Sequence, residues 1–379
     1  MPGDTTNDTT NDRTDIRLSL AQARALQLAA MGPLMSPRRR AKKADVLATI
    51  RSMNVLQIDT IDLVARSPYL VLWSRLGDYW SAWLYELLTE GALFEYWSHA
   101  ACFLPIEDYP HYRRQMLHLE AVGYERTALR LASAPLEHIE LIEHVREIGP
   151  VRATDFEHMD GRKADLKNSG WWNWKPGKVR LETLFTASEI MVKRREKFHR
   201  IYDVRGRVLP PHLLIDTLLP SPDAVNQHWT LAAVKAMGLA PARWIGDYFR
   251  HAGRVPHPHP DALVETGALL RIQVEGWANT AYVHADHANL LRAAQKDKLL
   301  PSYNTLLSPF DPVMWERERV LHLESGETGD DALAAHIAEA VTRCAAWHQT
   351  PVVRITHTTP SSFLPELRRA VRQQPTVNA

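Results

Sequence analysis

The sequence predicts a mixed α+β fold, mainly helical, in which three helices followed by a β-hairpin recur three times along the chain. Two observations support this prediction. Stretches with apolar residues at helical spacing begin at Ser or Pro and end at Gly or Pro. Each group of such stretches is followed by short runs typical of strands, separated by turn residues. Because three helices and a hairpin make a winged helix-turn-helix unit, we expect three such units in tandem.

The first unit is expected within residues 16–115. Ser19, followed three residues later by Gln22, is typical of a helix N-terminus. A second helix carries an apolar stripe and leads into a short extended segment at residues 55–61. Ser81 is expected to cap the third helix, and the hairpin follows it.

The second unit is expected within residues 138–210 and the third within residues 221–320. In the second, two alternating runs at 190–195 and 197–204 flank a tight polar turn, which predicts a hairpin. The third begins at Ser221-Pro222-Asp223, where an N-cap, a proline at the first helical position and an early acid coincide.

The flanking segments have a different composition. Residues 1–15 are rich in Thr, Asn and Asp and predict a disordered tail. Residues 331–379 predict a C-terminal region with a helix, a strand and a short basic helix. At residues 256–260 His and Pro alternate, which indicates an extended linker; a metal site is the alternative interpretation.

The composition is that of a globular protein. The 379 residues include 45 basic and 44 acidic side chains, which leaves a formal net charge of +1. With 45% hydrophobic and 23% charged residues, a disordered, collagenous or coiled-coil chain is excluded. We find no signal peptide, no long apolar run, and no zinc or disulfide spacing at Cys102 and Cys344. We therefore expect a cytoplasmic, nucleoid-associated protein that does not contact membranes.

The charges are unevenly distributed along the chain. Residues 36–51 contain six Lys or Arg and one acidic residue, and residues 161–210 contain thirteen basic and five acidic residues. Such segregation on a nearly neutral protein is expected of a surface that follows nucleic-acid phosphates. Solvated helix faces are the alternative interpretation.

The chain has no GxxxxGK[ST], GxGxxG, HExxH or GxSxG motif, which argues against nucleotide hydrolases, zincins and serine hydrolases. The candidate for chemistry is Gln57-Ile58-Asp59, because of its alternating side chains. In an extended strand, Gln57 and Asp59 share one face and lie about 6.6 Å apart, with room for a water molecule between them. The alternative is that Asp59 caps the turn into the next helix.

Four segments together carry a family resemblance: VLQIDTIDLVARSPYLVLWSRLGDY at 55–79, FEYWSHAACFLP at 94–105, YDVRGRVLP at 202–210 and LLSPFDPVMWERERV at 306–320. With this order and spacing, the chain resembles the YcaQ/AlkZ family of winged-helix DNA glycosylases over residues 17–320. The resemblance implies an enzyme that excises alkylated bases from double-stranded DNA and, in some members, unhooks interstrand crosslinks. It also implies that three winged helices form a concave DNA-binding scaffold.

The resemblance implies the catalytic roles as well. Gln57-Ile58-Asp59 matches the family's Gln-Φ-Asp branch, so Gln57 would position water or the sugar-phosphate, and Asp59 would activate the water and stabilise an oxocarbenium-like sugar. One carboxylate suffices because a purine alkylated at a ring nitrogen is already cationic, whereas ordinary glycosidases need a second one to protonate the leaving group. No metal or cofactor is implied. Because the motif contains no lysine, a monofunctional glycosylase is favoured over a lyase.

Further residues are candidate DNA contacts. Arg66 and Arg75 flank the motif and are expected to contact phosphates, with surface salt bridges as the alternative. His99 is expected to line the lesion pocket or to be a structural histidine. The basic hairpin supplies Lys193, Arg194 and Arg195.

Two further segments carry weaker expectations. Trp171, Trp172 and Trp174 would stack on bases or belong to the core. Asp311 is expected to cap the helix that follows it. After Val320 the chain departs from the family pattern, since residues 321–331 form only a short acidic connector.

Three different units in one chain suggest a monomer that wraps a lesion. The alternative function is a non-catalytic winged-helix transcriptional regulator, which would commonly dimerise and place a recognition helix in the major groove.

Overall fold

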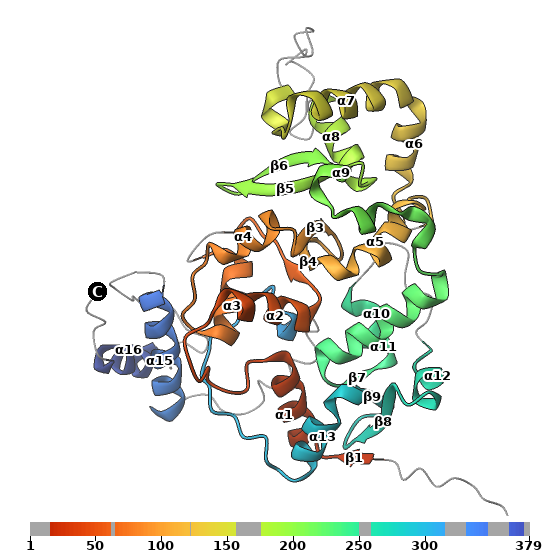
Figure 1. Ribbon diagram of the computed structural model, residues 1–379. Helices are drawn as coiled ribbons and strands as arrows, with labels where there is room; N and C mark the ends of the chain where they lie inside the picture. The colour runs from red at the N-terminus through yellow and green to blue at the C-terminus, as the bar shows by residue number, and fades with distance from the viewer. Residues whose placement is uncertain are drawn as a thin grey trace, which may run out of the picture.

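The computed structural model describes residues 16–61, 65–121, 123–156, 176–249, 259–314, 331–347 and 364–374. It confirms a mixed α+β fold that is mainly helical (Figure 1). The expected disordered tail, the His-Pro segment up to residue 258, and Trp171, Trp172 and Trp174 lie outside the described residues. Within those residues, no helix is both long enough and apolar enough to cross a membrane.

The described chain contains three groups of elements with one repeated order: a helix, a short extended segment, two helices or turns, and a β-hairpin (Figure 1). In each group the extended segment pairs with the second strand of the hairpin. The first group consists of α2 (Lys43–Met53), β2 (Leu56–Gln57), α3 (Ser67–Leu76), α4 (Trp83–Thr89), β3 (Leu93–Trp97) and β4 (Ala101–Pro105), with strand order β2-β4-β3.

The second group lies at one end of the molecule, above the first in Figure 1, and follows η1 (Ile106–Asp108), α5 (Tyr109–Met116) and α6 (Glu125–Ser133). It consists of α7 (Pro135–Ile148), an isolated bridge from Val151 to Tyr202, η2 (Ala153–Phe156), α8 (Pro176–Thr186), β5 (Ile190–Glu196) and β6 (His199–Val204). The hairpin predicted from the alternating runs is thus confirmed as β5 and β6.

The third group lies at the opposite end (Figure 1). It consists of α10 (Pro222–Met237), β7 (Ala240–Pro241), α11 (Ala242–Tyr248), α12 (Pro260–Glu265), β8 (Leu269–Val274), β9 (Ala281–His284) and α13 (Ala288–Gln295). Between the second and third groups lie α9 (Arg205–Val208), η3 (Pro211–Leu214) and η4 (Asp216–Leu218), while η5 (Ala285–His287) precedes α13. Ser221 caps α10 as expected, because its side chain accepts a bond from the Ala224 N–H.

The N-terminal elements pack against the third group, although the sequence placed them in the first unit. Strand β1 (Ile16–Leu18) is parallel to β8, and α1 (Leu20–Met31) shares a buried cluster with β8, β9 and α13. The three helices of the first group are instead α2, α3 and α4, and α3 was not predicted from the sequence. The capping box of Ser19 and Gln22 at the start of α1 is confirmed.

Buried aromatic rings connect the groups. Phe94 of β3 meets Tyr112 of α5 at 5.6 Å between ring centroids, Tyr112 meets Trp229 of α10 at 4.9 Å, and Trp229 meets Phe249 at 4.8 Å. On the other side, Tyr96 of β3 meets Phe185 of α8 at 5.8 Å. Aromatic pairs in such geometries add stabilisation beyond area burial, so these contacts help to fix one group relative to the next.

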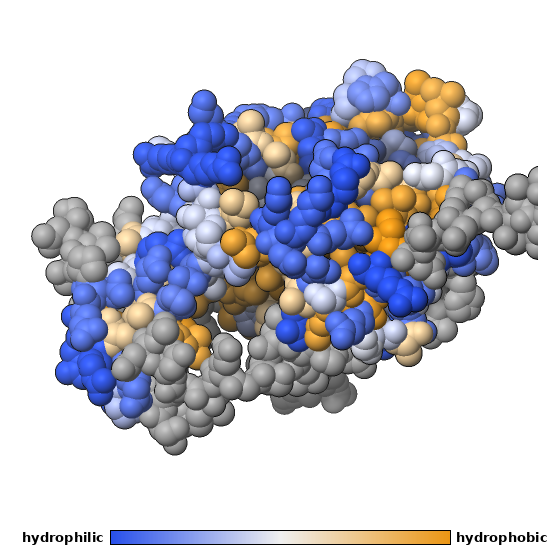
Figure 2. Space-filling view, turned by 90° about the horizontal axis from the view of Figure 1, so that it is seen from below, coloured by the Kyte–Doolittle hydropathy of each residue, from blue (hydrophilic) through white to orange (hydrophobic). Residues whose placement is uncertain are grey.

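The C-terminal helices α15 (Asp331–Trp347) and α16 (Leu364–Gln373) pack together beside the first group (Figure 1). Trp347 stacks on Tyr79 at 5.8 Å, and its Nε1–H donates to the Tyr79 carbonyl at 3.3 Å. The expected strand of this region lies outside the described residues. Seen from below, hydrophilic side chains cover much of the surface, with an apolar strip between them (Figure 2).

Arg75 is a structural residue, which corrects the expectation that it contacts DNA. Its side chain is 3% exposed and forms a bidentate pair with Asp311, at 2.6 and 2.9 Å. It also donates to the carbonyl of Met31 at 2.8 Å. Because a buried guanidinium already paired with a carboxylate is not available to a phosphate, we assign Arg75 to holding α1, α3 and the 311 turn together. Asp311 also accepts from the Val313 N–H at 2.9 Å, which confirms the expected cap at η6 (Pro312–Met314).

Removing the charge of Asp311 would therefore leave Arg75 as an uncompensated buried cation. We predict that Asp311→Asn lowers the free energy of unfolding by about 3–5 kcal/mol. The control is Asp286→Asn, whose partner Lys235 lies in an exposed pair and whose loss should cost at most about 1 kcal/mol. Chemical denaturation followed by circular dichroism measures both changes, and equal effects of the two substitutions would contradict this role for Arg75.

Gly238 permits the close approach of α10 to α1. It has φ +76°, and a Cβ at this position would lie 2.5 Å from Cβ of Ala30 and 3.2 Å from the Leu26 carbonyl oxygen. Gly267 has nearly the same φ, +77°, but a Cβ there would meet no atom within 4 Å.

This contrast gives a matched pair of variants. Both alanine substitutions place a Cβ on a backbone with positive φ, which strains it. Only in Gly238→Ala does the new Cβ also clash with α1. We predict that Gly238→Ala lowers the free energy of unfolding by about 1–3 kcal/mol more than Gly267→Ala does. Thermal or urea unfolding measures the difference, and a Gly267→Ala variant as unstable as Gly238→Ala would argue against the helix contact.

Candidate functional site

Gln57-Ile58-Asp59 continues the edge strand of the first group's sheet. Leu56 pairs with Phe103 and Gln57 with Cys102, and the Ile58 N–H donates to the Ala101 carbonyl at 2.7 Å. Leu56 and Ile58 are buried, whereas Gln57 and Asp59 are half-buried. The structure thus confirms the predicted alternation, which places the amide and the carboxylate on the face opposite the core.

His99 contacts Gln57 directly. Its Nε2 lies 2.9 Å from Oε1 of Gln57. Because an amide oxygen can only accept, His99 Nε2 carries the proton and donates it. His99 lies in the bend between β3 and β4, so the hairpin orients the Gln57 amide.

Asp59 is held by its own loop. The Ile61 N–H donates to Oδ1 of Asp59 at 2.7 Å, as in an Asx-turn. The alternative interpretation, that Asp59 caps a turn, is therefore correct for the hydrogen bond. This bond engages one carboxylate oxygen and restricts the position of the side chain. Asp59 remains half-buried, so part of its side chain is accessible to solvent.

A pocket of about 450 Å³ opens beside this strand, between the first and second groups. This volume lies within the range of small-molecule sites. The first group contributes Ile58, Thr60 and Ala101; the second contributes Arg152, Ala153, Thr154, Lys178, Glu182, Arg195, Phe198, His199, Arg200 and Tyr202. Sequence reasoning missed most of the second set.

One of the missed residues, Phe198, has a detectable signal. It lies in the β5–β6 turn with φ +75°, a conformation that is costly for a bulky side chain. The guanidinium groups of Arg66 and Arg195 lie 4.2 and 4.7 Å from its ring centroid, close enough for cation–π attraction. In the sequence, the signal is an aromatic residue within an otherwise polar hairpin turn, which suggests a contact beyond the hairpin.

Glu95 anchors the hairpin behind the pocket. This carboxylate is completely buried and accepts hydrogen bonds from Arg195, at 2.6 and 2.7 Å, and from Arg200. Burial alone would raise the pKa of Glu95, but Arg200 and Arg195 outweigh it and hold the pKa below its ordinary value. The expectation that Arg195 contacts DNA is therefore corrected, because its side chain is 4% exposed and paired.

The other predicted basic residues are more accessible. The side chains of Lys193 and Arg194 are 35% and 39% exposed, and they pair with Asp203 and Glu196, respectively. Arg66 is half-buried at the start of α3, above Phe198. The structure thus brings His99 to Gln57 and Arg66 to Phe198, which lines the pocket. Of the Gln57-Ile58-Asp59 segment only Ile58 lines the pocket, and Arg75 lies apart from it.

Comparison with known proteins gives two findings. The family model described as "DNA glycosylase AlkZ-like" matches residues 50–347, which is well over half of the chain. Among solved structures, the chain is similar to the Streptomyces sahachiroi DNA glycosylase AlkZ, at 17% identity and a TM-score of 0.49, covering 81% of this chain and 82% of that one. The family match, which includes the Gln57-Ile58-Asp59 strand and the pocket, shows that this chain belongs to the AlkZ-like family of DNA glycosylases.

Proposed function

We propose that this glycosylase hydrolyses the N-glycosidic bond of purines alkylated at a ring nitrogen in double-stranded DNA, including purines within interstrand crosslinks. The observation that carries the proposal is the placement of Gln57 and Asp59, both half-buried, on the outer face of an edge strand, with the Gln57 amide in contact with His99. One amide and one carboxylate suit a leaving group that needs no protonation.

The chemistry requires one activated water. Departure of the cationic purine gives a neutral base and leaves positive charge on the deoxyribose, which the Asp59 carboxylate stabilises. Asp59 then accepts a proton from water as the water attacks the anomeric carbon. The Gln57 amide, oriented by His99, holds that water or the adjoining phosphate. Because the motif contains no lysine to form an imine with the sugar, the reaction ends at an abasic site.

The pocket supports extrusion of the damaged nucleotide. An enzyme that acts on a base within a duplex must remove that base from the stack. The pocket lies between Ile58 of the motif and Phe198, a half-buried aromatic ring on which an extruded base can stack. Lys178 and Arg152 on the same wall would attract the phosphates on either side.

We further propose that the three groups are winged-helix units on a concave DNA-binding surface, with boundaries near residues 43–115, 138–210 and 221–320. The repeated element order and the pairing of each extended segment with its hairpin support this assignment. Arg66, Lys193 and Arg194 would contact phosphates from two adjacent units. We propose that the protein acts as a monomer in the cytoplasm, at the nucleoid.

The central prediction concerns Asp59→Asn. Asparagine keeps an oxygen that can accept from the Ile61 N–H but loses the negative charge, so the turn is retained while charge stabilisation is lost. We predict that the rate of base release falls at least about 100-fold, the order of effect expected for a lost electrostatic stabiliser, while DNA affinity changes little. Single-turnover assays on duplexes alkylated at purines measure the rate.

The control for this variant is Asp78→Asn, whose side chain is 66% exposed, and its rate should equal that of the wild type. Unchanged base release by Asp59→Asn would contradict the catalytic role of the carboxylate. Sequence-specific footprints, together with no base release by the wild type, would instead favour the winged-helix regulator.

A second prediction concerns His99, which we propose positions Gln57. His99→Ala should lower the single-turnover rate by about tenfold to 100-fold, since a misplacement of about 1 Å can cost that much. The DNA concentration that gives the half-maximal rate should change less than the maximal rate does. The control is His118→Ala, at an exposed position in the chain. A loss of DNA affinity at an unchanged rate would show that His99 binds DNA rather than positions the amide.

A further inference from the structure

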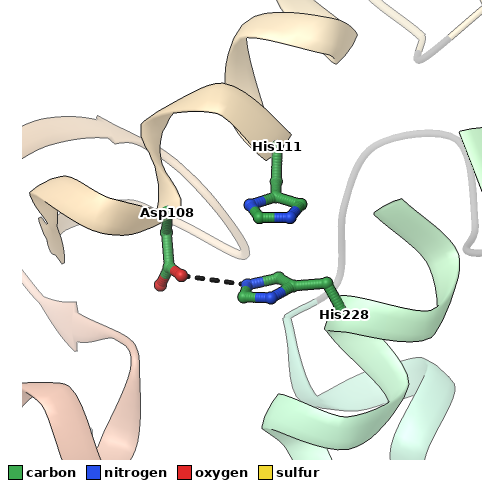
Figure 3. A group of neighbouring side chains, drawn as sticks. All are labelled: Asp108, His111 and His228. Carbon is green, nitrogen blue, oxygen red and sulfur yellow. Dashed lines mark hydrogen bonds and ion pairs between the residues drawn. The ribbon is translucent and has the colours of Figure 1, made fainter. Parts of the chain in front are cut away.

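A second group of polar side chains lies apart from the proposed active site and forms no part of the pocket beside Gln57. It consists of Asp108 at the end of η1, His111 in α5 and His228 in α10. One carboxylate oxygen and one nitrogen of each imidazole all lie within 4.8 Å of one another. Figure 3 shows both rings with a nitrogen on the side that faces Asp108.

The carboxylate of Asp108 is held in place from two directions. It is 3% exposed, its Oδ2 accepts from Nδ2 of Asn54 at 3.0 Å, and its Oδ1 accepts from Nε2 of His228 at 2.9 Å. Both donors are side chains that need not be charged. Burying a charged carboxylate costs free energy unless a cation or strong hydrogen-bond donors compensate its charge. This site therefore favours the binding of a cation.

The two histidines have unusual surroundings. Their rings are parallel within 9° and 3.7 Å apart between centroids. Nδ1 of His111 is buried and has no hydrogen-bond partner among the described residues. Imidazole nitrogens are common ligands of transition-metal ions.

We propose that Asp108, His111 and His228 form a binding site for a divalent transition-metal ion, with Zn²⁺ as the best match, that joins α5 to α10. Two imidazoles and one carboxylate are a common zinc ligand set, and a water would complete four-coordination. Asp108 and His111 are three residues apart, a spacing that places both on one face of a helix, as in carboxylate–histidine metal motifs of helical bundles. Imidazole ligands favour this class of ion over Mg²⁺ and Ca²⁺.

Binding requires a defined local change. Zinc–nitrogen bonds of about 2.0–2.1 Å in a tetrahedron place ligand atoms roughly 3.4 Å apart, so the three atoms must move closer together. The two rings must also turn out of their parallel stack, because each lone pair has to lie in the plane of its ring. The proton on Nε2 of His228 moves to Nδ1, and Asp108 exchanges that hydrogen bond for the metal. His228 is 29% exposed, which gives the ion a path to the site.

The test uses the full chain without an affinity tag, freed of metal by a chelator and dialysis. Titration with Zn²⁺ against a chromophoric competitor should give one ion per chain, and Zn²⁺ should raise the thermal midpoint with increasing concentration. Co²⁺ in the same site should give visible absorption bands of a four-coordinate ion. His111→Ala and His228→Ala should each lower the affinity at least about tenfold and abolish the Co²⁺ bands.

Two controls separate this site from other histidines. His284→Ala removes a ring from a separate cluster with His287, and the double variant His257→Ala/His259→Ala replaces both histidines of the His-Pro segment. Both should bind one ion as the wild type does. If one site variant fails to fold by circular dichroism, the other, together with X-ray absorption of the Zn²⁺-loaded wild type showing two imidazole ligands, still decides the question.

The absence of saturable binding by the wild type would overturn the proposal, and so would unchanged affinity in His111→Ala and His228→Ala. The proposal is independent of base excision, since none of the three side chains lines the pocket beside Gln57.

Discussion

The buried carboxylate of Glu95 is the constraint on which the candidate active site depends. It lies on β3 in the hairpin of the first group and accepts hydrogen bonds from Arg195 and Arg200, which lie on the two strands of the second group's hairpin. Removing one partner of such a buried ion pair is expected to lower the free energy of unfolding by about 3–5 kcal/mol. This ionic contact therefore fixes the hairpin over the first sheet, and the pocket lined by Ile58, Thr60 and Ala101 lies between the two.

The strand that carries Gln57 and Asp59 is positioned in a different way. Backbone pairing with β4 and burial of Leu56 and Ile58 leave only one face for the two polar side chains. A shift of one residue in the register would bury Gln57 and expose Ile58, so the core on one side specifies the site on the other. His99 and the Asx-turn at Asp59 then restrict the side chains themselves. The rigid parts of the fold thus hold the proposed reactive groups in place before DNA binds.

Local features of the fold were predictable from the sequence, and long-range contacts were not. The capping box at Ser19, the hairpin of β5 and β6, and the alternation at residues 56–59 all depend on residues close together in the chain. The pairing of β1 with β8 and the ion pairs of Arg75 and Arg195 join positions about a hundred or more residues apart, which composition and spacing do not encode. Both arginines carry the charge expected of a phosphate contact, but burial decides their role. The cluster of Asp108, His111 and His228 likewise forms only when α5 meets α10. The catalytic assignment of Gln57 and Asp59 remains a prediction, which the geometry supports.

The most direct test of the account is to identify what the wild-type protein releases from a panel of duplexes with different alkylated purines, including a crosslinked one, by mass spectrometry. We predict a free alkylated purine, an intact strand with an abasic site at the position of the lesion, and no requirement for an added cofactor. Intact DNA across the whole panel, or strand cleavage without a free base, would contradict it.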